Sequence, residues 1–305
     1  MTLRQAQDEP QKCGLVAVIG APNAGKSTLV NQLVGQKVAI TSAKAQTTRA
    51  RLLGIALHDE TQILLVDTPG IFEPKRRLDR AMVSAAWEGT TAADAVLLVV
   101  DPVKQRRHEL MPLIEVLKDR PEKKILVLNK VDASAKEPLL VLAQELTEAV
   151  GFGEVYFVSA LTGDGVPELK ERLAEMMPEG PWHYPEDQVS DASERLLAAE
   201  VTREQLYCQL HEELPYDAAV RPESYEQRPD GSVEIRQQIV IARDSQKPIV
   251  LGKQGRRIKE IGEAARKELA DILGQKVHLF LHVKVDERWS ENREVYEEMG
   301  LDWVR

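Results

Sequence analysis

The sequence contains little cysteine and no long apolar run. Only Cys13 and Cys208 occur among its 305 residues, far apart, which argues against a disulfide framework and for buried or idle thiols in a reducing compartment. No run approaches the roughly 18 consecutive apolar residues of a membrane span. The N-terminal stretch MTLRQAQDEPQK lacks the apolar core of a signal peptide. We therefore expect a cytoplasmic protein.

An excess of positive charge is also absent, because the formal net charge is −9. This argues against a protein that coats nucleic acid indiscriminately. One stretch differs from the rest: residues 243–267 contain eight Lys/Arg and three Asp/Glu. This local surplus of positive charge predicts one specialised surface for a polyanion.

The first half of the chain has the pattern of an α/β domain. The length suggests two domains. Short runs rich in Val, Ile and Leu occur at residues 14–19, 61–67, 95–101, 124–129 and 155–159. Helical patterns lie between these runs. Such strands, alternating with helices, predict a mostly parallel sheet that is covered on both faces.

A change of composition marks the end of this domain. Residues 178–188, PEGPWHYPEDQ, contain three prolines and a glycine, which is typical of an ordered, stiff linker. Aromatic side chains in such a linker more often pack it onto the surface of a domain than form a binding site. We predict an N-terminal tail at 1–13, a first domain at 14–178, a linker at 179–190 and a second domain at 191–305.

The second domain is predicted to be α+β. Its pattern gives a helix at 191–213, a strand at 233–243, a glycine-bearing loop at 252–255, a helix at 256–273 and a strand at 276–285. Both strands alternate apolar and polar residues, as half-exposed strands do. The order is α-β-β-α-α-β if a short strand precedes residues 226–229 and a helix precedes the loop.

A phosphate-binding loop follows the first strand and opens a helix. Gly20, Gly25, Lys26 and Ser27 fit the pattern G-x-x-x-x-G-K-[ST]. Glycines let the backbone curl so that its N–H groups point at phosphate oxygens, and the helix N-terminus adds partial positive charge. Lys26 is expected to neutralise the β and γ phosphates. The predicted nucleotide-binding residues of this loop are Gly20, Ala21, Pro22, Asn23, Ala24, Gly25, Lys26, Ser27 and Thr28.

The sequence NKVD at 129–132 predicts a guanine-binding site. An ionised Asp132 can accept hydrogen bonds from the N1–H and the exocyclic amine of guanine, whereas adenine offers an acceptor at that edge. Asn129 is expected to brace the loops and the stem of Lys130 to cover the base. Ser159 and Ala160 follow a later strand, where a backbone N–H could reach the guanine O6.

The sequence DTPG ends the strand at 61–67 and predicts the γ-phosphate contact. We expect Asp67, Thr68, Pro69 and Gly70 to bind nucleotide, with the Gly70 N–H on the γ phosphate. Ser27, Asp67 and one threonine of the polar loop KAQTTRAR would hold Mg²⁺. Of Thr47 and Thr48 we favour Thr48. The predicted catalytic residues are Lys26, Thr48 and Gly70.

These motifs, in this order, resemble those of translation-factor-class GTPases. The resemblance implies GTP and GDP as ligands. One residue departs from Ras-like enzymes: Ile71 stands where they have a glutamine, and its apolar side chain cannot orient a water. The switch backbone, a K⁺ ion or a bound partner must then position the attacking water, and intrinsic hydrolysis is expected to be slow.

The loop at 252–255 resembles the GxxG loop of a type II KH domain, which clamps about four nucleotides of single-stranded RNA. The RNA-binding residues predicted here are Gly252, Lys253, Gln254, Gly255, Arg256, Arg257 and Lys259. A helix N-terminus with a solvated charged face is the alternative. Ile258 and Ile261 are expected in the core, Ile239 and Ile241 could flank bases, and His278 and His282 are expected to be structural.

Over nearly all of residues 14–300 the chain resembles the bacterial Era family of GTPases. The stretches that carry this resemblance are APNA, ITSAKAQTTR, ELPYDAAV at 213–220 and the loop at 252–255. It implies binding to the 3′ end of 16S ribosomal RNA, assistance in small-subunit assembly, peripheral association with the inner membrane and a monomeric state. A second hypothesis is a non-catalytic RNA-assembly scaffold with a structural nucleotide; Ile71 slightly favours it.

Overall fold

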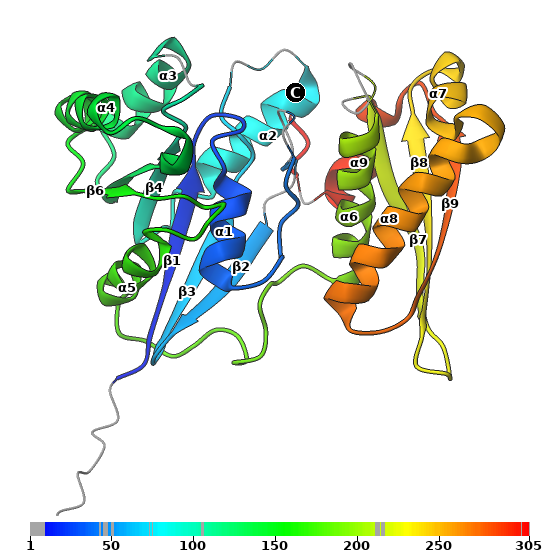
Figure 1. Cartoon of the computed structure of the whole chain (residues 1–305), viewed down its shortest axis with the longest axis horizontal. Helices are drawn as coiled ribbons and strands as arrows, with labels where there is room; N and C mark the ends of the chain where they lie inside the picture. Colours follow the sequence, from blue (N-terminus) through cyan, green and yellow to red (C-terminus); the bar gives the residue numbers. More distant parts are fainter. Residues whose placement is uncertain are drawn as a thin grey trace, which may run out of the picture.

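The computed structural model describes residues 10–42, 44, 48–49, 52–72, 74, 76–104, 107–210, 214, 217–299 and 301–304. The chain forms an α/β unit followed by a smaller α+β unit, the fold class that the sequence predicts (Figure 1). None of the helices described is long and apolar enough to cross a membrane.

The first unit is built on a six-stranded sheet in the order β2-β3-β1-β4-β5-β6. Its strands are β1 (Lys12–Ile19), β2 (Leu52–His58), β3 (Thr61–Asp67), β4 (Ala95–Val100), β5 (Lys123–Leu128) and β6 (Glu154–Phe157). All neighbouring strands are parallel except β2 and β3.

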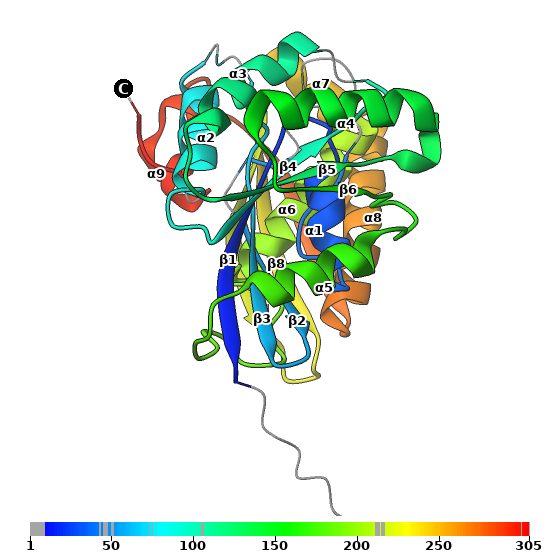
Figure 2. The same ribbon diagram turned by 90° about the vertical axis from the view of Figure 1, so that its left-hand side faces the viewer.

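Helices cover both faces of this sheet (Figure 2). They are α1 (Lys26–Val34), α2 (Arg77–Glu88), α3 (Arg107–Lys118), α4 (Lys136–Val150) and α5 (Val166–Met176). Apolar side chains of α1 and α5 pack on one face, and those of α3 and α4 pack on the other. The parallel strands therefore bury both faces, and their carboxyl ends meet at one edge.

The edge strand β2 was not among the predicted strands. Gly54 interrupts its apolar run and weakens the strand pattern. A Cβ on Gly54 would lie 3.0 Å from side-chain carbons of both Val30 and Val34. The glycine thus lets α1 pack closely on the sheet, a requirement that no local pattern reveals.

The segment 179–190 runs along the first unit before α6, the first helix of the second. It makes isolated bridges from Glu179 to Lys12 and from Ser190 to Gly54. Trp182 donates its indole N–H to the Glu60 carbonyl at 3.1 Å, and both Trp182 and Tyr184 pack on the cluster that includes Cys13. The predicted role of these aromatic residues as pins is confirmed.

The second unit has the predicted order α-β-β-α-α-β. Its elements are α6 (Glu194–Gln209), β7 (Ala218–Gln227), β8 (Val233–Ile241), α7 (Lys247–Leu251), α8 (Arg256–Leu273), β9 (Val277–Val285) and α9 (Arg293–Glu298). The sheet order is β7-β8-β9, with β7 antiparallel and β9 parallel to β8. Apolar side chains of α6 and α8 pack on the sheet.

Three details of this unit differ from the prediction. The helix α6 begins after Ser193, whose hydroxyl caps it, and is shorter than 191–213. The strand β7 is long rather than short, and α9 was not predicted. Ile239 and Ile241 are fully buried among core side chains, so the expectation that they could flank bases is wrong.

The two units share an apolar interface. Leu78 and Met82 of α2 pack with Val240, Trp289 and Tyr296 in one buried cluster. The element that follows the DTPG loop therefore touches the second unit directly.

Candidate functional site

The loop between β1 and α1 has the backbone that the phosphate-loop pattern requires. Gly25 has a φ of +94°, in the left-handed region, and a Cβ there would lie 2.2 Å from Asn129 Nδ2. A Cβ on Gly20 would lie 2.3 Å from the Val99 carbonyl oxygen. Only glycine fits at these two positions.

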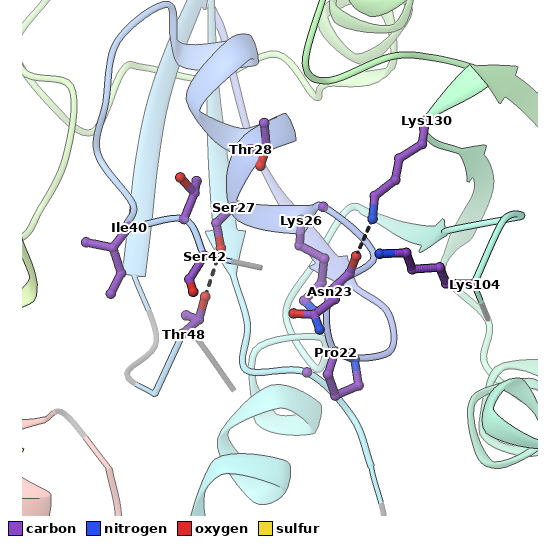
Figure 3. Close-up of a pocket in the computed structure, with 13 residues that line it drawn as sticks. Pro22, Asn23, Lys26, Ser27, Thr28, Ile40, Ser42, Thr48, Lys104 and Lys130 are labelled. Atoms are coloured by element: carbon purple, nitrogen blue, oxygen red, sulfur yellow. Dashed lines mark hydrogen bonds between the residues drawn. The ribbon is translucent and has the colours of Figure 1, made fainter. Parts of the chain in front are cut away.

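This loop borders a cavity of about 200 Å³ (Figure 3). The cavity is lined by Pro22, Asn23, Gly25, Lys26, Ser27, Thr28, Ile40, Thr41, Ser42, Thr48, Gly70, Lys104 and Lys130. The structure thus brings together predicted residues from four separate stretches of sequence. It adds Ile40, Thr41 and Ser42 from the connection between α1 and β2, and Lys104 from the loop after β4.

Lys26 is buried at the floor of this site. Its Nζ donates hydrogen bonds to the carbonyl oxygens of Gly20 at 3.2 Å and Ala21 at 3.1 Å. Burial lowers the pKa of Lys26 to about 8, although the nearby Asp67 carboxylate opposes this. Phosphate oxygens placed beside the ammonium would favour its charged form again.

Three oxygen-bearing side chains converge next to Lys26. Ser27 Oγ lies 2.8 Å from Thr48 Oγ1 and 2.7 Å from Asp67 Oδ2, and Thr48 Oγ1 lies 3.2 Å from Asp67 Oδ2. Asp67 Oδ1 is buried and has no hydrogen-bond partner in the described part of the chain. Burial raises the pKa of Asp67, opposed by Lys26 and by the two hydroxyls. A hard cation such as Mg²⁺ suits this oxygen donor set and the unpartnered carboxylate oxygen.

The other predicted threonine, Thr47, lies outside the described residues. Across the residues that are described, no group of three or more His, Cys, Asp and Glu side chains could hold a metal ion. The hydroxyl-rich cluster is therefore the candidate for a metal site.

Asn129 joins three loops. Its Nδ2 donates to the Ala24 carbonyl at 2.9 Å, and its Oδ1 accepts from the backbone N–H groups of Lys130 at 2.8 Å and Ala160 at 2.9 Å. This is the bracing expected from the sequence. The Ala160 N–H, predicted to reach a base, is thus bonded to Asn129 in this structure.

Lys130 is held by Asp101, a residue that was not predicted from the sequence. Its Nζ donates to the Asn23 carbonyl at 2.8 Å and to Asp101 Oδ2 at 2.6 Å. Asp101 directly follows β4, and an acidic residue at that position is a pattern from which an anchor, though not its partner, could be predicted. Asp132 lies exposed on a 3-10 turn after β5, while Ser159 is buried after β6. Their base contacts stay predictions.

The DTPG loop packs against the phosphate loop. Thr68 Oγ1 donates to the Val18 carbonyl at 2.8 Å. A Cβ on Gly70 would lie 2.9 Å from Pro22 Cα. The Ile71 N–H donates to the Gly20 carbonyl at 3.1 Å, and the Ile71 side chain is buried in an apolar cluster. Ile71 does not line the cavity, so another group must orient the attacking water.

The glycine loop of the second unit also has backbone that favours glycine. Gly252 and Gly255 have φ values of +70° and +76°, and a Cβ on Gly252 would lie 2.6 Å from Arg257 Cβ. Arg257 Nη1 donates to the Gln209 carbonyl, whereas Lys259 projects outward with an exposed side chain. The predicted cations therefore divide into an inward-held Arg257 and solvent-facing neighbours.

A groove of about 310 Å³ runs between α8 and β9. It is lined by Ile258, Lys259, Gly262, Glu263, Arg266, Leu279, Phe280 and Leu281. Phe280 is 45% exposed, and the Arg236 guanidinium lies 4.7 Å from its ring centroid. The apolar walls of this groove and the cations Lys259 and Arg266 suit the bases and phosphates of single-stranded RNA. Phe280 lies between Leu279 and Leu281, which pack on the α8 side, and is paired with Arg236 of β8, so its exposed ring is on the other face of the sheet.

Comparisons with known proteins give matches for both units. A family model described as "50S ribosome-binding GTPase" matches residues 15–130, and one described as "KH domain" matches residues 213–290. A protein named GTPase Era from Erythrobacter litoralis (strain HTCC2594) is 80% identical over 298 residues, which cover 96% of this chain and 98% of that protein. GTPase Era from Maricaulis maris (strain MCS10) is 53% identical over 97% of this chain and 99% of that protein.

Solved structures that resemble nearly the whole chain include one with bound RNA. It is a crystal structure of Era in complex with MgGDPNP and nucleotides 1506–1542 of 16S ribosomal RNA. Its TM-score is 0.90 at 38% identity, and the match covers 95% of this chain and 99% of that one.

Proposed function

The chain belongs to the Era family of GTPases, and from this we propose that it is a GTP-hydrolysing switch that binds the 3′ region of 16S ribosomal RNA. The KH unit would hold the RNA, and the protein would assist assembly of the small ribosomal subunit. The observation that carries the proposal is the likeness over both units to an Era bound to that RNA and to a GTP analogue.

The description of the matching GTPase model names the large subunit instead. That model covers residues 15–130 alone, which form part of the nucleotide-binding unit and include none of the KH groove. The likeness to the complex with 16S RNA spans both units. We therefore assign the small subunit to this chain.

In the proposed reaction, the predicted nucleotide-binding residues have separate roles. Amide groups of residues 20–28 and the Lys26 ammonium would hold the β and γ phosphates, and the Gly70 N–H would contact the γ phosphate. Ser27, Thr48 and Asp67 would hold Mg²⁺, which neutralises phosphate charge when bound. Asp132 would select guanine. The switch backbone, K⁺ or a partner would orient the attacking water.

Four further assignments extend the proposal. The domain limits are a tail at 1–13, a GTPase domain at 14–178, a linker at 179–190 and a KH domain at 191–305. The protein would act as a monomer in the cytoplasm, with peripheral association to the inner membrane. The family resemblance supports the membrane association, and the change of sheet between β6 and β7 supports the domain limits.

Replacing Gly255 by aspartate tests the RNA site. A Cβ at Gly255 would meet no atom within 4 Å, so the new carboxylate would project into the space beside the loop and repel phosphate. We expect affinity for a 16S 3′-end RNA fragment to fall about tenfold or more, with GTP affinity unchanged. Fluorescence anisotropy with labelled RNA measures the change.

Gly274→Asp is the matched control. Gly274 caps the opposite end of α8, with a φ of +63° and no atom within 4 Å of its Cβ position. The Gly274→Asp variant therefore adds the same charge and nearly the same backbone strain as Gly255→Asp, but at a position away from the groove. RNA affinity that is equal in the two variants would place the RNA site elsewhere.

A further inference from the structure

The helix α6 of the KH unit holds the connection between α1 and β2, which we call the switch segment (residues 36–51). Glu204 on α6 is buried, and its Oε1 accepts from the Thr41 backbone N–H at 2.8 Å and from Thr41 Oγ1 at 3.2 Å. Its Oε2 pairs with the Lys37 ammonium, which also pairs with Glu268 on α8. One carboxylate thus fixes two positions of the segment.

Arg49 anchors the far end of the same segment. Its side chain is 2% exposed although it is charged. Nη1 donates to the Ala218 carbonyl at 2.7 Å, and Nη2 donates to the Tyr207 hydroxyl at 3.0 Å. The guanidinium also lies 5.8 Å from the Tyr207 ring centroid and 5.9 Å from that of Trp289. All three partners belong to the second unit.

These anchors flank the residues that face the nucleotide cavity. Ile40, Thr41, Ser42 and Thr48 line it, and Thr48 is the covalent neighbour of Arg49. Consecutive Cα atoms are about 3.8 Å apart, so a shift of the Arg49 backbone would also move Thr48, whose hydroxyl lies beside Ser27 and Asp67. Burial makes such a shift costly, because a buried charge that loses its partners is strongly destabilised.

We propose that Glu204 and Arg49 are positioning residues for the GTPase reaction: the KH unit, through α6, holds Thr48 where GTP and its cation require it. The inference rests on the proposed function and deepens it, because the nucleotide site is then complete only while α6 is in place. The last turn of α6 also bonds to the start of α8, where the Gln209 carbonyl accepts from Arg257. The same helix therefore contacts both candidate sites.

Glu204→Gln in the full chain tests the proposal. The amide keeps the size of the side chain but removes the charge that pairs with Lys37. Thr48 is expected to matter only when a γ phosphate is present. We therefore expect about tenfold weaker binding of GDPNP with Mg²⁺, unchanged binding of GDP and an unchanged melting temperature within a few degrees. Titration calorimetry measures both affinities.

Two further variants complete the design. Glu297→Gln removes the same charge from the exposed surface of α9 and should leave both affinities unchanged. Lys37→Met breaks the Lys37–Glu204 pair and also the Lys37–Glu268 pair, so it should weaken GDPNP binding at least as much as Glu204→Gln does. The double variant should be no weaker than Lys37→Met alone, because the Lys37–Glu204 pair is already broken in it.

The outcomes separate this inference from the proposed function. Wild-type affinity of Glu204→Gln for GDPNP, or an equal loss for GDP and GDPNP, would overturn the positioning role. Failure of the wild-type chain to bind GDPNP would instead overturn the proposed function.

Discussion

Lys26→Ala is expected to lower kcat/KM for GTP hydrolysis by about 10²–10³-fold or more. The Lys26 ammonium is buried and bonded only to loop carbonyls within the described part of the chain, so phosphate oxygens would be its partners for charge. Among the described residues that line the cavity, the other cations are Lys104 and Lys130, which come from the loops after β4 and β5 rather than from the phosphate loop (Figure 3). Phosphate release under single-turnover conditions measures the effect.

Lys123→Ala serves as the control for this variant. Lys123 is an exposed lysine at the start of β5, at the opposite edge of the sheet from the cavity. The Lys123→Ala variant should hydrolyse GTP at the wild-type rate. If Lys26→Ala also kept that rate, the phosphate site would have been assigned to the wrong loop.

Asp132→Asn is expected to change the preferred base from guanine to xanthine. An amide can donate to the carbonyl oxygen that xanthine carries in place of the guanine amine, and it cannot accept both guanine hydrogen bonds. The ratio of GTP to XTP affinity should change by a factor on the order of 10⁴. Competition of each nucleotide against a fluorescent GDP analogue measures that ratio.

Asp119→Asn, an exposed carboxylate next to the end of α3, is the matched control and should keep the preference for GTP. Unchanged guanine selectivity in Asp132→Asn would mean that another group reads the base.

The sequence predicted what local patterns encode. The cavity residues Lys26, Thr48 and Gly70 stand in short motifs that each follow a strand or helix, and parallel strands bring such ends to one edge. The order of the KH elements also followed from alternation and from two glycines. The strand β2 was missed, because Gly54 is explained by its packing against α1 rather than by its neighbours in sequence.

Contacts between distant residues could not be predicted. Arg49 and Ala218 are 169 positions apart, and Arg49 reads in sequence as a solvated loop residue. Its burial becomes visible only when α6, β7 and Trp289 surround it. Asp101 directly follows β4, but its pairing with Lys130, 29 positions away in the same unit, is also not visible in local sequence. Packing across the two units, not local propensity, determines the position of Arg49.

The scaffold hypothesis, with a purely structural nucleotide, is less consistent with the site. Membership in a GTPase family and the convergence of Ser27, Thr48 and Asp67 favour a site that responds to the γ phosphate. A structural site has no need of such a cluster. Ile71 is buried and does not line the cavity, and slow hydrolysis without a partner stays a prediction.

We propose that nucleotide state and RNA binding are linked, because α6 holds Thr41 beside the nucleotide cavity and also bonds to Arg257 at the start of α8. The most direct test of this linkage is the affinity of the full chain for a 16S 3′-end RNA fragment, measured with GDPNP and with GDP in the presence of Mg²⁺. We expect tighter RNA binding with GDPNP than with GDP, and a GDPNP affinity that RNA raises in the same ratio, because such linkage is reciprocal. Equal RNA affinity in the two nucleotide states would contradict it.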